Sequence, residues 1–288
     1  MFEGFQLEEI DVGEVVLRVR HGGEGSPVVL LHGHPRTHAT WHRVAARLAP
    51  RHMVVCPDLR GYGHSMLPPD QPDHGQSSKR AMAADVVAAM RKLGHDRFAV
   101  VGHDRGGLVA LRAALDHPGV VTRVVIMDAL PVVEHLERLN EDFVRSWWHW
   151  WFMGQTEKPA ERVICADPGA WYRTPAPEVM GAEAHAELWQ SLLDPAVVHG
   201  MCEDYRAGLG IDRMHEEADR AAGRQVACPM LFLAAAHDDI DIHGDPVAIW
   251  RPWVSGRLSA AVIDSGHHQA EDAPGEVAAA LADFLAEG

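Results

Sequence analysis

The sequence predicts a three-layer α/β fold: a mostly parallel sheet with helices on both faces, and an inserted helical lid. Short β-branched runs alternate with amphipathic stretches, a pattern typical of a parallel sheet covered on both sides. Residues 132–218 interrupt this alternation with a tryptophan-rich region that lacks strand-like runs, and the β pattern returns after it. We therefore expect a core formed by residues 1–131 and 219–288, and a helical cap at 132–218.

The individual elements follow from the same periodicity. Two short alternating segments, 6–11 and 14–20, predict an antiparallel hairpin at the start of the chain. Further strands are expected at 28–33, 52–58, 98–103, 123–128, 229–236 and 258–266. Helices of the core are expected at 41–49, 79–94, 107–118 and 276–287.

Composition and charge narrow the function classes. The 288 residues carry a formal net charge of −15, and the absence of basic patches argues against a nucleic-acid partner. The N-terminus is acidic, and no apolar run reaches the length of a membrane span, so we expect no signal peptide and no membrane partner. Four widely spaced cysteines favour a reduced, cytoplasmic protein. A small molecule is the expected substrate.

Polar residues follow four of the predicted strands. They are HGHP at 32–35, GHDRG at 102–106, Asp128, and GHH at 266–268. In open α/β sheets, ligands bind outside the carboxyl ends of the strands. We therefore expect these four segments to meet in one site.

GHDRG fits the strand–turn–helix pattern G-x-nucleophile-x-G, with Asp104 at the nucleophile position. The alternative is that Asp104 only caps the following helix. A carboxylate is ionised at neutral pH, so it can attack a saturated carbon directly and form an alkyl ester. Carbon–halogen bonds and epoxide C–O bonds are suitable targets for such an attack.

Hydrolysis of this ester needs a base to activate water. His267, after the last strand, is the candidate, and His268 is the neighbour most easily mistaken for it. The base needs a carboxylate to orient it. Asp128 is favoured for this role, with Asp238 or Asp239 as the alternative.

Two further predictions concern the turn at HGHP. The backbone N–H of His34, together with that of Arg105, is expected to stabilise the oxyanion of ester hydrolysis, and a cis Pro35 is compatible with the turn.

The histidines also suggest a metal site, but they form no compact ligand motif, so no metal and no cofactor are expected. The histidines considered are His32, His34, His103, His267 and His268.

Several motifs together resemble the fluoroacetate and haloacetate dehalogenases of the α/β-hydrolase fold. They are HGHPRTHATWHRVAARLA, GHDRGG, MDALP, HW at 149–150, MCEDYRAG at 201–208 and SGH at 265–267, and the likeness covers nearly the whole chain. The resemblance implies Asp104 as nucleophile, His267 as base and Asp128 as its partner. It also implies that Arg105 holds the substrate carboxylate and that a homodimer is plausible. It assigns a halide-binding role to three donors, His149, Trp150 and Tyr205. Their neighbours Trp147, Trp148 and Trp151 are expected to pack.

The sequence departs from the family at two positions that concern the substrate. Leu108 stands where the family has a second carboxylate-binding arginine, and His34 replaces the usual phenylalanine. The predicted function is hydrolysis of a small 2-haloacid such as fluoroacetate. Leu108 keeps a second hypothesis open, an epoxide hydrolase or a related enzyme with a less charged substrate, for which Tyr172 and Tyr205 would be the lid donors. A third hypothesis is an inactive binding protein, which the complete set of nucleophile, base and acid argues against.

Overall fold

The computed structural model describes residues 1–172 and 174–286. Its sheet has eight strands in the order β1-β2-β4-β3-β5-β6-β7-β8. Strands β3 to β8 run parallel to one another, and β1 and β2 form the predicted hairpin, antiparallel to each other and, through β2, to β4. The strands are β1 (Gln6–Asp11), β2 (Val16–Gly22), β3 (Ser26–Leu31), β4 (His52–Pro57), β5 (Phe98–His103), β6 (Val121–Met127), β7 (Met230–Ala235) and β8 (Leu258–Ile263).

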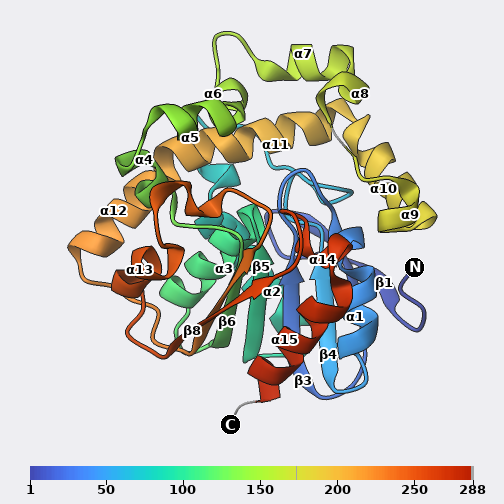
Figure 1. Ribbon diagram of the computed structural model, residues 1–288. Helices are drawn as coiled ribbons and strands as arrows, with labels where there is room; N and C mark the ends of the chain where they lie inside the picture. The colour runs from blue at the N-terminus through green and yellow to red at the C-terminus, as the bar shows by residue number, and fades with distance from the viewer. Residues whose placement is uncertain (173, 287–288) are drawn as a thin grey trace.

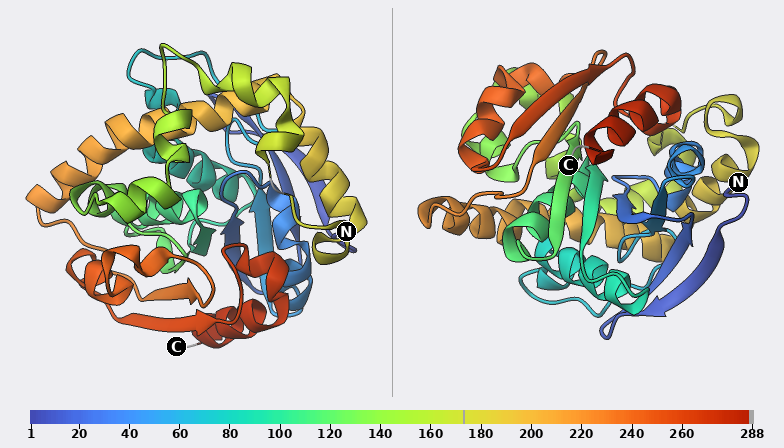
Figure 2. Two further views of the ribbon diagram at one scale, coloured as in Figure 1. Left: turned by 45° about the horizontal axis from the view of Figure 1, so that its top comes forward. Right: turned by 90° about the horizontal axis from the view of Figure 1, so that it is seen from below.

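Alternation along the central strands creates an apolar core on each face of the sheet. In β3, Val28 and Leu30 belong to one core while Val29 and Leu31 belong to the other. Figure 2 shows the helices on the two faces, red and blue on one side and teal on the other. The first face is covered by α1 (His42–Leu48) and α15 (Pro274–Ala286), and the second by α2 (Lys79–Lys92) and α3 (Arg105–Asp116).

The described part of the chain between β6 and β7, the region in which the sequence predicts a cap, forms helices joined by loops. Figure 1 shows these helices gathered at one end of the sheet, with α11 crossing above the central strands. They are α4 (Val132–Glu137), α5 (Glu141–Ser146), α6 (His149–Met153), α7 (Ala160–Ala166), α8 (Pro168–Trp171), α9 (Pro177–Met180), α10 (Ala182–Leu192), α11 (Pro195–Ala207), the π-helical turn η3 (Gly208–Asp212) and α12 (Arg213–Ala221).

The observed boundaries differ from the predicted ones by a few residues. Helix α3 begins at Arg105 rather than at 107, because it starts directly from the turn that holds Asp104. Helix α12 runs to Ala221, beyond the predicted end of the cap at 218, and the predicted last helical residue, 287, lies outside the described residues. Several short helices of the core were not predicted from the sequence. They are η1 (His38–Trp41), η2 (Gly75–Ser77), η4 (Ile240–His243), α13 (Pro246–Trp250), η5 (Arg251–Trp253) and α14 (Gln269–Asp272). In the described part of the chain, no helix has both the length and the apolar character needed to cross a membrane.

Candidate active site

Asp104 lies in a strained turn between β5 and α3. Its φ of 50° and ψ of −120° fall in a region that L-residues rarely adopt. A Cβ on Gly102 would lie 2.1 Å from the carbonyl oxygen of Gly106, so the tight turn requires glycine there. This local geometry lifts the Asp104 side chain out of the sheet, where it lines a cavity.

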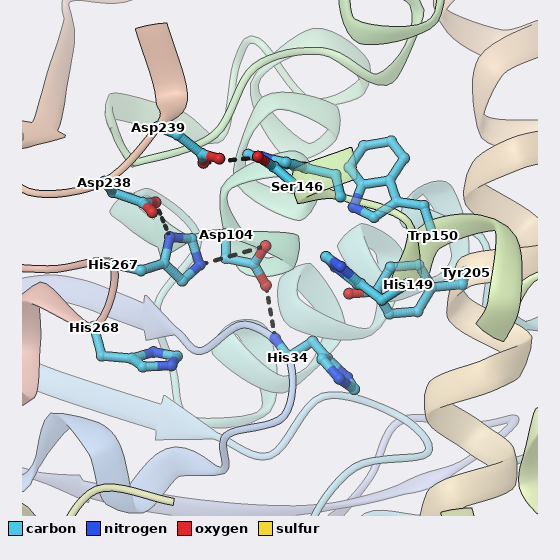
Figure 3. Close-up of a pocket in the computed structure, with 11 residues that line it drawn as sticks. His34, Asp104, Ser146, His149, Trp150, Tyr205, Asp238, Asp239, His267 and His268 are labelled. Atoms are coloured by element: carbon cyan, nitrogen blue, oxygen red, sulfur yellow. Dashed lines mark hydrogen bonds and ion pairs between the residues drawn. The ribbon is translucent and has the colours of Figure 1, made fainter. Parts of the chain in front are cut away.

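His267 faces Asp104 from the loop after β8. Its Nε2 is 3.9 Å from Oδ2 of Asp104, and its Nδ1 donates to two carboxylates. The distances from Nδ1 are 2.8 Å to Oδ2 of Asp128 and 2.7 Å to Oδ2 of Asp238. Figure 3 shows His267 between Asp238 and Asp104. The sequence offered these carboxylates as alternatives, and the structure brings both to the same nitrogen.

The two carboxylates change the proton affinity of the imidazole. Burial alone would lower the pKa of His267, but its hydrogen bonds to Asp128 and Asp238 raise that pKa well above its ordinary value. Burial and the neighbouring Asp238 raise the pKa of Asp128, while the bond to His267 lowers that of Asp238 against the effect of burial.

The surroundings of Asp104 favour its ionised form. Burial raises its pKa, yet His267, His103 and the backbone N–H of Arg105 together bring the pKa below the usual value. The backbone N–H of His34 donates to its Oδ1 at 2.7 Å. The two main-chain donors considered for the oxyanion site thus both bond the carboxylate of Asp104, and the peptide bond before Pro35 is cis.

The cavity beside Asp104 has a volume of about 270 Å³. His149, Trp150 and Tyr205 line it on the side of Asp104 that lies away from His267, with their nitrogen and oxygen atoms toward Asp104 (Figure 3). We call these three residues the donor cradle. Burial lowers the pKa of His149 to about 4, so at neutral pH its ring is uncharged and offers one N–H. The remaining lining residues are His34, Ser146, Trp147, Asp238, Asp239 and His268.

Arg105 does not lie where the resemblance implied. Its guanidinium is buried behind the cradle, where Nη2 donates to Oδ1 of Asp204 at 2.8 Å and Nε to Oδ2 at 3.1 Å. Its Cζ lies 4.4 Å from the ring centre of Tyr205 and 5.8 Å from that of Trp150. Arg105 therefore supports the cradle from behind instead of lining the cavity as a free cation. The sequence could not reveal this, because Asp204 lies 99 residues further along the chain.

Leu108 is buried and lines a separate recess behind Asp104. Arg105, His135, Trp147 and Trp150 also line this recess, whose free volume is about 10 Å³. His135 was missed by the sequence analysis. It is buried against the aromatic rings of the cap, its Nδ1 is 3.0 Å from Nε2 of His243, and burial lowers its pKa to about 3.

The other aromatic residues of the cap that the sequence analysis considered differ in whether they line the cavity. Trp147, expected to pack, lines the cavity, and its Nε1 donates to Oδ1 of Asp239 at 2.9 Å, which turns that carboxylate away from the base. Trp148, also expected to pack, contacts the rings of Phe152 and Trp171 but is 51% exposed. Trp151 does pack, against Phe143. The hydroxyl of Tyr172 points to Sδ of Met201 at 3.4 Å, so Tyr172 is not a donor to this cavity.

Two of the histidines considered as metal ligands, His32 and His103, make hydrogen bonds within the protein. His32 donates from Nδ1 to the carbonyl of Gly33 and accepts from the N–H of Leu59, so both ring nitrogens are occupied. His103 bonds the carbonyl of His267 through Nε2 at 2.7 Å. Two groups of potential ligands occur among the described residues, one of them the base with its two acids. The groups are Asp70, His199 and Glu203, and Asp128, Asp238 and His267.

The model of the alpha/beta hydrolase fold family matches residues 26–274. The chain belongs to the α/β-hydrolase family. The strand order, the turn at Asp104 and the base after the last strand agree with this membership.

The relatives include a fluoroacetate dehalogenase and several epoxide hydrolases. Fluoroacetate dehalogenase from Burkholderia sp is 38% identical over 294 aligned residues, which cover 100% of this chain and 96% of the relative. Soluble epoxide hydrolase from Corynebacterium sp. (strain C12) is 30% identical, covering 88% of this chain and 87% of the relative. A crystal structure of a candidate alpha/beta hydrolase from Nostoc sp PCC 7120 is 37% identical, covers 100% of both chains and has a TM-score of 0.96. A candidate epoxide hydrolase from Pseudomonas aeruginosa is 38% identical, with 99% and 97% coverage and a TM-score of 0.92.

The shared hydrogen bond at Nδ1 leads to a prediction about pH. Because Asp238 helps to raise the pKa of His267, Asp238→Asn should lower that pKa. With His267 as the predicted base, which accepts a proton only when neutral, we expect turnover to rise with pH through this pKa and the rise to move to lower pH in the variant. We expect turnover at the optimum to stay within about tenfold of the wild type, because Asp128 still holds the ring. Profiles of kcat against pH for Asp238→Asn and Asp128→Asn would check this, and an unshifted profile for Asp238→Asn would contradict it.

Proposed function

We propose that this hydrolase removes a halide from a small organohalide through an alkyl ester formed on Asp104. The observation that carries the proposal is the position of the Asp104 carboxylate in one cavity, between the base His267 and the donor cradle. This arrangement suits the displacement of an anionic leaving group, because hydrogen-bond donors lie on the side where its charge would develop.

In the first step, an oxygen of Asp104 attacks the carbon that bears the halogen. The new C–O bond forms as the carbon–halogen bond breaks, and the halide leaves with the bonding electron pair. Donors from His149, Trp150 and Tyr205 would stabilise the halide as it departs. The guanidinium of Arg105, which lies over two of these rings, would hold them in position from behind.

In the second step, His267 takes a proton from water, and the water oxygen attacks the carbonyl carbon of the Asp104 ester. The N–H groups of His34 and Arg105 would hold the resulting oxyanion. Collapse releases an alcohol and restores the carboxylate with one oxygen from water. Esterification removes the negative charge of Asp104, which helps to raise the pKa of His267, so that pKa falls at the step in which the imidazole takes a proton.

Two findings bear on the choice of the bond that is broken. The Burkholderia relative, fluoroacetate dehalogenase, supports a carbon–halogen bond and makes 2-haloacids such as fluoroacetate the first substrates to test. The epoxide hydrolase relatives support an epoxide as the second candidate. Tyr172 weakens that candidate, since its hydroxyl bonds Met201 and it does not line the cavity.

The proposal is tested by a screen of halide release run beside a panel of epoxides. Fluoro-, chloro- and bromo-substituted acetates, acetamides and ethanols would be incubated with the enzyme, and free halide measured against a blank. We expect halide from at least one class. Diol formation from epoxides without halide from any organohalide would overturn the proposal in favour of the second candidate.

The donor cradle gives a prediction about the leaving group. Trp150→Phe removes one N–H while keeping an aromatic ring, and fluoride depends on such donors more than bromide does. Because a hydrogen bond to a charged group contributes about 1.5–3 kcal/mol, we expect release of fluoride to slow about tenfold to a hundredfold, and release of bromide much less. Single-turnover halide release from a matched fluoro and bromo pair would measure this.

Trp151→Phe is the matched control, since Trp151 neighbours Trp150 but packs against Phe143 and does not line the cavity. It should affect both halides alike. An equal loss for fluoride and bromide in Trp150→Phe would mean that this indole N–H does not contact the leaving group.

A further inference from the structure

The charges around the cavity are unfavourable to an anionic substrate. No lysine or arginine lines the cavity among the residues that the structure describes. The imidazoles of His34 and His149 are uncharged at neutral pH, because burial lowers their pKa values to about 3 and about 4. His267 is the basic group that faces the substrate, and it is already paired with carboxylates. Three carboxylates line the cavity: Asp104, Asp238 and Asp239.

Arg105 follows Asp104 directly in the sequence, but its positive charge is neutralised by the carboxylate of Asp204. Its partner Asp204 also accepts from Tyr62 at 2.6 Å and contacts Nζ of Lys79. Lys79 in turn lies 3.4 Å from Asp212, so two cations and two carboxylates form one buried, neutral cluster. Moving the guanidinium of Arg105 toward a substrate would disrupt a buried ion pair, which is strongly destabilising.

The recess beside Leu108 gives no room for a carboxylate. Its free volume of about 10 Å³ is close to that of one water molecule. Leu108 and Leu130 both line it, and the guanidinium of Arg105, which also lines it, is paired with Asp204. A substrate carboxylate there would therefore lose its hydration without gaining a free cation as partner. The position at which the resemblance implies a second cation thus presents an apolar surface.

Part of the rim of the cavity, formed by Ser146, Asp238 and Asp239, is rich in hydrogen-bond acceptors. Asp238 and Asp239 line it together with the hydroxyl of Ser146 (Figure 3). Such groups can accept from the N–H of an amide or the O–H of an alcohol, whereas a carboxylate has no proton to donate.

From these observations we infer that the substrate is a small, uncharged organohalide with a hydrogen-bond donor, such as a 2-haloamide, rather than the anion of a 2-haloacid. The inference rests on the proposed function and narrows its substrate class. For a 2-haloamide, Asp104 displaces the halide, and water then releases the 2-hydroxyamide, with the proton of water passing to His267.

The test compares kcat/KM for 2-chloroacetamide and chloroacetate with the same enzyme. Each value is divided by the rate constant for attack of free acetate on the same compound, which removes the difference in intrinsic reactivity. We expect the corrected ratio to favour the amide at least tenfold. Leu108→Arg should lower this ratio at least tenfold by supplying a cation, while Leu108→Met, which conserves volume and charge, should leave the ratio as it is.

The outcomes separate the inference from the proposed function. A corrected ratio in wild type that is below tenfold, or that favours chloroacetate, would overturn the inference and leave the proposed function standing. Absence of halide and of an ester on Asp104 with every organohalide would overturn the proposed function itself. The wild-type ratio decides the inference even if Leu108→Arg fails to fold, which thermal unfolding would reveal.

Discussion

Asp104→Asn should reduce halide release by at least about 10³-fold, because an amide oxygen is not a competent nucleophile toward saturated carbon. The change keeps the size of the side chain and the acceptor oxygen that receives the N–H of His34. Its effect should therefore fall on the chemical step and leave the fold intact. Halide release, measured together with the unfolding temperature, would separate these two effects.

Asp283→Asn provides the control for this experiment. It makes the same chemical change at an exposed position on α15, away from the cavity, and should leave halide release as in the wild type. If Asp104→Asn kept more than a tenth of the wild-type rate, another group would have to make the attack.

His267→Asn should stop the reaction half-way and accumulate the alkyl ester. The first step needs no base, because the Asp104 carboxylate is already ionised, whereas hydrolysis of the ester needs a group that takes a proton from water. We expect a burst of about one halide per enzyme, followed by a loss of turnover. Intact-protein mass spectrometry would detect the adduct, and peptide mapping would locate it on Asp104.

Two variants make this result specific. The double variant Asp104→Asn/His267→Asn should show neither burst nor adduct. His268→Asn removes the adjacent imidazole, whose pKa burial and nearby positive charges lower well below its ordinary value, and it should not trap the ester. Turnover of His267→Asn at the wild-type rate would show that the base has been assigned to the wrong residue.

The fold and the location of the site could be predicted from the sequence because both depend on local patterns. Alternation along 98–103 and the glycines of the following turn place Asp104 at the end of a strand, and the chain order then points to His267. Parallel strands that end at one edge bring such residues together, even when more than a hundred positions separate them.

Features that depend on packing between distant segments could not be predicted in the same way. Sequence order alone does not show whether Asp128 or Asp238 reaches His267, and the structure gives both within hydrogen-bond distance. Arg105 looks free in the sequence because Asp204 comes from a cap helix. The partial exposure of Trp148 could not be predicted either, because its neighbours in the sequence are mostly aromatic and give no pattern of buried and exposed positions.

The hydrogen bonds of two carboxylates to His267 have a consequence for the evolution of the site. Asp128 follows β6 and Asp238 follows β7, so the two carboxylates belong to separate segments of the chain. A chain that holds both can lose one by a single substitution and still keep its imidazole oriented by the other. Under the proposed mechanism, a lineage could therefore exchange the acid after one strand for the acid after its neighbour without losing activity in between.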